Sequence, residues 1–229
     1  MDNDEKHLVD DAEKVLKKTE RSNGDEVKEA NEIFSQWFDW AQVFLGVDVP
    51  EEKNSYFLTA YIESLREIQS SIVLALHGSY KNAVQILRNW LELIVAGIYY
   101  DHYTAEGKDW EDKGRFISFK NFKRRLRNDK VLSEETVSAA SSMWDILSNY
   151  VHSCAHTLES LSGEDTYGMI APVYNQKYFD DWFGFLGEMY ELCSILLVEH
   201  IPEVRKSDKI GEFFKPTTLE QLRRRIANK

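Results

Sequence analysis

The chain has 229 residues, of which 43% are apolar and 13% are aromatic, so it can bury a sizeable core and is most simply one domain with additional helices. Its net charge of -11 argues against nonspecific nucleic-acid binding by the whole surface and restricts any such site to a local basic patch. No run approaches the roughly 18 uncharged apolar residues of a membrane span, and the acidic N-terminal region lacks a secretory apolar stretch, so a cytoplasmic protein is expected.

Cysteine, proline and glycine usage favours a helical protein without disulfides. Cys154 and Cys193 lie far apart in apolar helical contexts and form neither a disulfide framework nor a zinc pattern, which predicts reduced core thiols. Only 4 prolines and 11 glycines interrupt the chain. This composition predicts long helices rather than many short strands.

The N-terminal part of the chain predicts two helices. The first, over residues 2–20, is charged and amphipathic. The second has apolar residues at three- and four-residue spacing from Ala30 to Leu45, and it ends before Gly46. Together they predict an N-terminal helical pair over residues 1–50.

A long helical hairpin is predicted at the centre of the sequence. Its first helix runs from about Ser55 to His77, after which Gly78 is expected in the left-handed conformation and Ser79 can cap the next helix. So short a connection leaves two helices as antiparallel neighbours. The hairpin is therefore the framework of the expected bundle core, residues 51–202.

The remaining sequence predicts further helices around this hairpin. In chain order we expect a loop over 107–114, a short basic helix over 116–127, a long helix over 133–160, an irregular segment over 161–176 and an apolar helix over 178–201. Residues 203–229 predict a tail with a short helix, in which Thr217 and Glu220 form a capping box. The expected fold is all-α, a helical bundle built on a long antiparallel hairpin with extra N- and C-terminal helices.

The second helix of the hairpin, residues 80–103, carries a polar ladder in an otherwise apolar sequence. Lys81, Gln85, Arg88 and Glu92 follow one another along one face. Arg88 could hold a phosphate or the charge that develops on one, with Glu92 orienting it. The alternative is an internal ion pair that fixes helix packing, since burying either charge alone costs on the order of several kcal/mol.

A second polar face carries histidines. In the long helix after the basic one, Asn149, His152 and His156 fall opposite the apolar stripe. Imidazoles one turn apart suit general acid–base cleavage of a phosphodiester, although the same pattern is typical of a partly exposed polar face. The two histidines could also bind a metal, with Glu159 or Glu92 as a further ligand. The sequence, however, has neither the adjacent glutamate of an H-E-x-x-H motif nor a second cluster of ligands. We therefore expect neither a metal nor a cofactor.

The short basic helix combines lysine and arginine with interleaved phenylalanines. Phosphate contacts and base stacking would make this segment an RNA-contacting strip on an acidic protein. The alternative is a solvated helix face whose phenylalanines anchor it to the core. The basic residues are Lys120, Lys123, Arg124, Arg125 and Arg127, and the phenylalanines are Phe116, Phe119 and Phe122.

Two short motifs resemble a group of bacterial helical proteins related to the HEPN superfamily. They are LHGSYKNA with LRNWLE, within residues 76–92, and LSNYVH over residues 147–152. The resemblance covers roughly residues 56–199 and implies a helical bundle that is commonly dimeric. Many members of the superfamily are metal-independent RNases of toxin–antitoxin or antiphage systems, and others have lost activity and serve as binding modules.

The sequence departs from the catalytic motif of that superfamily, which is an arginine, four to six intervening residues and a histidine on one helix. The arginine positions before His152 hold Leu147, Ile146 and Asp145. Either Arg88 substitutes for the missing arginine from the neighbouring hairpin, or the chain is not a HEPN-type nuclease.

Two hypotheses of function follow from these patterns. In the first, a defence or toxin-type protein acts on RNA as an endoribonuclease, with His152 as the acid–base group and Arg88 as the phosphate stabiliser. In the second, the chain is a non-catalytic interaction module of a defence or regulatory complex, and its acidic surface meets a protein partner. Under both hypotheses, the chain is expected to form a homodimer through its polar histidine face.

Overall fold

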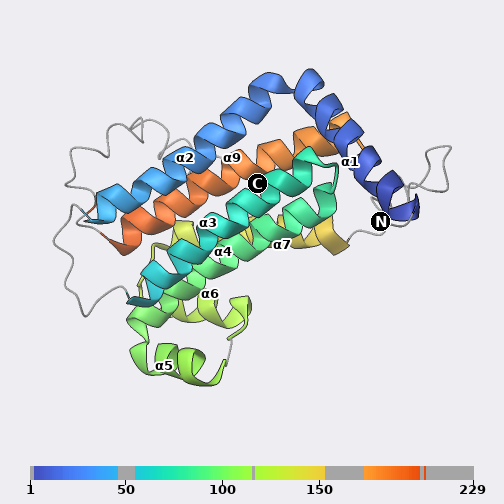
Figure 1. The fold of residues 1–229 in the computed structure, drawn as a ribbon. Helices are drawn as coiled ribbons and strands as arrows, with labels where there is room; N and C mark the ends of the chain where they lie inside the picture. Colours follow the sequence, from blue (N-terminus) through green and yellow to red (C-terminus); the bar gives the residue numbers. More distant parts are fainter. Residues whose placement is uncertain (1–2, 46–54, 115–116, 153–172, 202–203, 205–229) are drawn as a thin grey trace.

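A computed structural model of the protein describes residues 3–45, 55–114, 117–152, 173–201 and 204 (Figure 1). Every regular element within these ranges is a helix, which confirms the predicted all-α class. The helices are α1 (Asn3–Ser22), α2 (Gly24–Leu45), α3 (Ser55–Leu76), α4 (Tyr80–His102), α5 (Thr104–Lys113), α6 (Phe119–Asn128), α7 (Glu134–His152) and α9 (Gln176–His200).

Helices α3 and α4 lie antiparallel along their whole length at the centre of the bundle (Figure 1). Near their connection, the Ser71 hydroxyl donates a 2.9 Å hydrogen bond to the carbonyl oxygen of Ala83. At the far end, a Cβ added to Gly97 would lie 2.9 Å from Cα of Phe57. The absence of a side chain at Gly97 therefore lets the two backbones approach closely.

The turn between α3 and α4 depends on glycine for two reasons. Gly78 has a φ of 78°, the left-handed conformation predicted for it. A Cβ at this position would also lie 2.7 Å from the carbonyl oxygen of Val173, so the chain before α9 packs directly on the turn. Ser79 occupies the N-cap position of α4, but its side chain makes no capping hydrogen bond.

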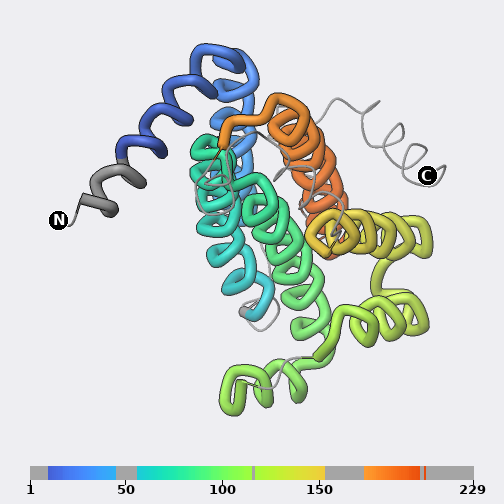
Figure 2. Tube along the Cα trace, turned by 90° about the vertical axis from the view of Figure 1, so that its right-hand side faces the viewer, coloured from blue at the N-terminus to red at the C-terminus, as the bar shows by residue number. Residues whose placement is uncertain are grey.

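Side chains from four helices meet in an aromatic core. The Trp37 ring of α2 lies 5.3 Å from Tyr61 of α3, 5.2 Å from Trp90 of α4 and 6.4 Å from Tyr190 of α9, measured between ring centroids. Its indole Nε1 donates a 2.9 Å hydrogen bond to the hydroxyl of Ser64, which satisfies the buried N–H. Helix α7 packs on α4 and α9 outside this group (Figure 2).

The loop predicted over residues 107–114 is wrong, because the structure has helix α5 there. Gly107 lies against the ring of Tyr56, where an added Cβ would be 2.6 Å from a ring carbon. Trp110 stacks on Tyr100 with ring centroids 5.1 Å apart and an interplanar angle of 7°. This packing outweighs the low helix propensity of an internal glycine, and Gly114 with a φ of 61° then ends the helix.

The described helices differ from membrane spans. None of them combines the length and the apolar character that a bilayer crossing requires.

Candidate functional site

Arg88 and Glu92 meet a third side chain, Trp144, where α4 contacts α7. Nε of Arg88 lies 3.3 Å from Oε1 of Glu92, and the two side chains are 18% and 21% exposed. Nε1 of Trp144 donates a 2.6 Å hydrogen bond to the same oxygen. The guanidinium carbon of Arg88 lies 5.4 Å from the centre of the Trp144 ring, a cation–π contact. Arg88 is thus held by a carboxylate and an indole face.

The contact between Arg88 and Glu92 is an ion pair without an aligned hydrogen bond. Nε of Arg88 is buried, and it has no hydrogen-bond acceptor because its N–H is not directed at the carboxylate oxygen. The attraction therefore rests on charge and on the partly desolvated surroundings.

The N-terminal half of the polar ladder lies next to α3. Nε2 of Gln85 donates a 3.0 Å hydrogen bond to Oδ1 of Asn89. Burial raises the pKa of the Glu67 carboxyl of α3, a hydrogen bond from Asn89 opposes this rise, and the nearby charge of Glu63 reinforces it. Lys81 is exposed at the start of α4. The predicted ladder is therefore divided between a contact with α3 and a contact with α7.

Trp144 also joins this group to helix α6. Its ring stacks on Phe119 with centroids 5.3 Å apart and an interplanar angle of 9°. Next to this pair, Nζ of Lys123 donates a 2.7 Å hydrogen bond to the hydroxyl of Ser141 in α7. The α4–α7 contact is thereby covered on one side by the basic helix.

The predicted histidine face has a different location. Asn149 and His152 are exposed in the last turn of α7, and His156 lies outside the described residues. His152 follows Trp144 by eight residues, roughly 12 Å along the helix axis. Among the described residues, no hydrogen bond or ion pair joins His152 to Arg88. The structure brings Arg88 and Glu92 together and does not bring His152 to them.

Helix α6 has the amphipathic form that the sequence predicts. Phe119, Phe122 and Leu126 are buried against the bundle. Lys120, Arg124 and Arg127 are exposed, and at 100° per residue they form one stripe along the opposite side. Phe116 lies outside the described residues.

Arg125 points away from this stripe and takes part in an internal cluster. Its Nη1 donates a 2.5 Å hydrogen bond to Oε1 of Glu106, and its guanidinium carbon lies 3.9 Å from the centre of the Tyr103 ring. The second Glu106 oxygen accepts a 2.7 Å hydrogen bond from Tyr99, and burial together with this bond raises the pKa of the tyrosine. Arg125 therefore joins α6 to α4 and α5.

A buried histidine–aspartate pair was not predicted from the sequence. Nε2 of His200 lies 3.0 Å from Oδ2 of Asp101, and the side chains are 11% and 3% exposed. Oδ1 of Asp101 accepts hydrogen bonds of 3.0 and 3.1 Å from the backbone N–H groups of Tyr56 and Phe57. The carboxylate thus caps α3 while it holds the end of α9. Asp101 and His200 each stand at the end of a predicted helix, but no spacing rule pairs them.

A surface pocket of about 600 Å³ lies at the N-terminus of α7, with Arg127 and Lys130 on its wall. The carboxylate of Glu199 occupies the position that an anion would take. It accepts hydrogen bonds from the Ser133 N–H at 3.1 Å, the Ser133 hydroxyl at 3.0 Å and the Thr136 hydroxyl at 2.8 Å. The partial positive charge at the N-terminus of α7 is therefore already neutralised by a carboxylate of the protein itself.

Within the described ranges, no group of three or more His, Cys, Asp or Glu side chains is arranged to hold a metal ion. Comparisons with protein-family models, with curated proteins and with solved structures gave no match to this chain. The resemblance to the HEPN superfamily accordingly rests on the short motifs alone.

Proposed function

We propose that this protein is a non-catalytic helical interaction module rather than a ribonuclease. The observation that carries the proposal is the engagement of Arg88 by Glu92 and Trp144. An arginine that stabilises a transferring phosphate needs N–H groups directed at the substrate and a positive charge that is not already neutralised. Here the neighbouring carboxylate opposes an incoming phosphate, and the guanidinium lies on an indole ring.

In this proposal the polar group of α4 specifies how the helices pack. Removing one member of a buried ion pair leaves the other charge uncompensated, so the pair favours the one arrangement in which both are satisfied. Glu92 extends that selectivity to α7 through Trp144. The module would then present its acidic surface to a protein partner, as the net charge of -11 favours.

The catalytic alternative is tested by incubating the purified chain with a mixed RNA pool in EDTA. We expect no cleavage beyond that of a mock purification. Cleavage by the wild type that His152→Ala abolishes would overturn the proposal, whereas cleavage unchanged by His152→Ala would indicate a contaminating nuclease.

The structural role of Arg88 has its own test. Arg88→Ala should lower Tm by about 3–10 °C, because it leaves Glu92 partly buried without its cation. Arg66→Ala is the matched control, since Arg66 forms an exposed pair with Glu63 in which the arginine is 72% exposed. The control should change Tm by about 1 °C or less.

We further expect two copies to associate through the exposed end of α7 that carries Asn149 and His152. The replacement Asn149→Arg would introduce like charges across a two-fold contact and should shift the protein toward monomer. Light scattering that detects only monomer for the wild type at micromolar concentration would remove this part of the proposal.

RNA binding without cleavage is a second candidate function, favoured by the exposed stripe of Lys120, Arg124 and Arg127. The test is fluorescence anisotropy with a labelled single-stranded RNA at several salt concentrations. Reversal of the three charges to glutamate should abolish salt-dependent binding, whereas Lys14→Glu and Lys17→Glu, in exposed pairs of α1, should not. Absence of binding by the wild type would exclude this candidate.

A further inference from the structure

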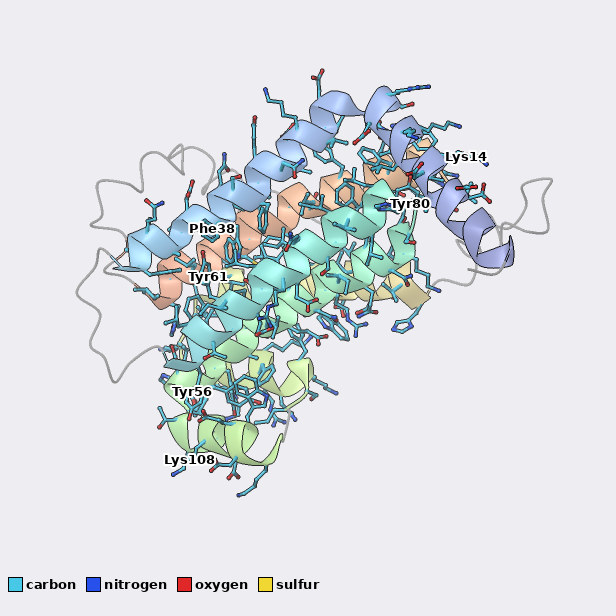
Figure 3. The ribbon with its side chains drawn as sticks, viewed as in Figure 1. Lys14, Phe38, Tyr56, Tyr61, Tyr80 and Lys108 are labelled. Atoms are coloured by element: carbon cyan, nitrogen blue, oxygen red, sulfur yellow. The ribbon has the colours of Figure 1, made fainter. Side chains whose placement is uncertain are left out.

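Most of the large apolar side chains that are exposed among the described residues lie on one face, formed by helices α2 and α3. Phe38 is 53% exposed, Leu58 46%, Ile62 48% and Val73 48%. At 100° per residue, the three residues of α3 fall within about 60° of one another around the helix. The Tyr61 hydroxyl donates a 3.3 Å hydrogen bond to the backbone oxygen of Phe38, which places Phe38 next to the turn that holds Ile62 (Figure 3). We call Phe38, Leu58, Ile62 and Val73 the α2–α3 face.

The α2–α3 face carries no net charge, although the protein as a whole is acidic. The acidic residues of α2 all lie about 100° or more around the helix from Phe38. They are Asp25, Glu26, Glu29, Glu32 and Asp39. On α3, Glu63 and Glu67 lie about 100° or more from Ile62. The charge next to Ile62 is Arg66, and Nη1 of this arginine is paired with Oε1 of Glu63 at 3.0 Å.

This distribution of charge favours a second copy of the chain as the occupant of the face. Two chains with a net charge of -11 repel each other, and the repulsion is least where the apposed surfaces carry no net charge. The central parts of protein interfaces are depleted of charged residues in the same way. A strongly charged partner segment would find no opposite charge on this face, because the charge of Arg66 is balanced by Glu63. An apolar surface without net charge therefore matches a copy of itself.

We propose that two copies of the chain associate through the α2–α3 face, with their α3 helices antiparallel about a two-fold axis near Leu65. Leu58 and Val73 are about equally far from Leu65 on either side, so Leu58 of one copy packs against Val73 of the other. Arg66 of each copy then lies opposite Glu63 of the other, which allows the exposed ion pair to form between the copies. The proposal is independent of whether the module is catalytic.

The face is large enough for such a contact. Helices α2 and α3 have 22 residues each, which corresponds to a length of about 33 Å. Two packed helices are roughly 20 Å wide, so the face measures on the order of 600 Å² per copy. Burial of this face in both copies removes roughly 1,200 Å² from solvent, which is the lower limit of stable protein–protein interfaces. We therefore expect a dimer that forms at micromolar concentration.

The oligomeric state of the Asn149→Arg variant tests the proposal, because this change removes the separate contact expected at the end of α7. Sedimentation velocity at micromolar concentration should show a dimer, and if the α7 contact also forms, the wild type makes a larger assembly. Adding Ile62→Arg should raise the Kd of the dimer by about tenfold or more, since it places a charge inside the contact. Val173→Arg is the matched control, because Val173 is 50% exposed but lies outside α2 and α3, and it should leave the Kd unchanged within about twofold. Both replaced side chains are half-exposed, so both variants should keep the Tm of their parent within about 2 °C.

Disulfide cross-linking between copies tests the antiparallel arrangement. Leu58→Cys and Val73→Cys are made in separate chains, each with Cys154→Ser, while Cys193 stays because it is buried and its burial raises the thiol pKa. Across the two-fold axis Leu58 faces Val73, whereas the two copies of either position are roughly 20–25 Å apart. A mixture of the two chains should therefore form a cross-linked dimer about tenfold faster, or more, than either chain alone.

Three outcomes would overturn the proposal. They are a monomeric Asn149→Arg variant, equal effects of Ile62→Arg and Val173→Arg, and equal cross-linking rates for the mixed and the separate chains. Salt gives an independent readout, because the proposed contact is apolar and joins two chains of like charge. Raising NaCl from about 50 to about 500 mM should strengthen the dimer, and a dimer that weakens with salt would show that charge pairs hold it instead.

Discussion

Oε1 of Glu92 accepts a 2.6 Å hydrogen bond from Nε1 of Trp144 and lies 3.3 Å from Nε of Arg88. One carboxylate oxygen therefore serves a partner in its own helix and a partner in α7. This arrangement accounts for a charged pair in a largely buried helix, because both charges and the partly buried indole N–H of Trp144 are compensated at a single contact.

Two substitutions of Glu92 should separate the loss of its hydrogen-bond acceptor from the loss of its charge. Glu92→Ala leaves the indole N–H and Arg88 without a partner and should lower the free energy of unfolding by about 2–3 kcal/mol. Glu92→Gln keeps an acceptor for Trp144 and should cost about 1 kcal/mol. Urea unfolding measures both values, and equal losses for the two variants would contradict the shared role.

Asp101 should be among the most important single carboxylates for stability. Asp101→Ala removes the cap of α3 and the partner of His200, with an expected loss of about 2–4 kcal/mol. Glu13→Ala is a suitable control, because Glu13 is 65% exposed in its pair with Lys17 and should contribute about 0–0.5 kcal/mol. Similar unfolding midpoints for the two variants would refute the capping role.

The two left-handed glycines allow backbone strain to be separated from steric contact. Gly78→Ala and Gly114→Ala both place a side chain at positive φ, which costs about 1 kcal/mol. Only at Gly78 does the new Cβ meet another segment, the Val173 carbonyl, whereas nothing lies within 4 Å of it at Gly114. Gly78→Ala should therefore lose about 1–3 kcal/mol more in thermal or urea unfolding.

Lys130 is a position where glycine should stabilise the protein. Its φ is 54°, and its N–H bonds to the Arg127 oxygen while the Val131 N–H bonds to the Leu126 oxygen, which is the Schellman pattern at the end of α6. Lys130→Gly should raise the free energy of unfolding by about 0.5–1 kcal/mol. Arg124→Gly, inside the same helix, should instead lower it by about 1 kcal/mol, and a loss at both positions would contradict this account.

Glu67 should make the stability depend on pH in the acidic to neutral range. Its folded pKa is raised from 4.5, chiefly by burial, so the folded state holds this proton more tightly than the unfolded state does. The resulting stabilisation is complete below the unfolded pKa and is lost as the pH rises through the folded value. Glu67→Gln should therefore gain in Tm relative to the wild type between pH 4 and pH 7. A constant difference in Tm would show that the carboxyl does not titrate in this way.

Much of the helical architecture could be predicted from the sequence, because it depends on the spacing of residues within each segment. The apolar spacing of α2 and of the α3–α4 hairpin reflects faces that must be buried, and glycine at position 78 reflects a backbone conformation that other residues avoid. The amphipathic form of α6 follows from the same rule. Helix α5 could not be predicted in this way, since packing of Gly107 on Tyr56 stabilises it from outside its own sequence.

The sequence by itself determined that this protein is all-helical and that Arg88 and Glu92 share a helix face, because both properties follow from spacing along one segment. Only the tertiary structure decided which partners that face meets. Arg88 contacts Trp144, Asp101 caps α3 and holds His200, and Glu199 occupies the start of α7. Such pairings depend on how the helices are rotated and aligned against one another, and this is set by the packing of the whole core.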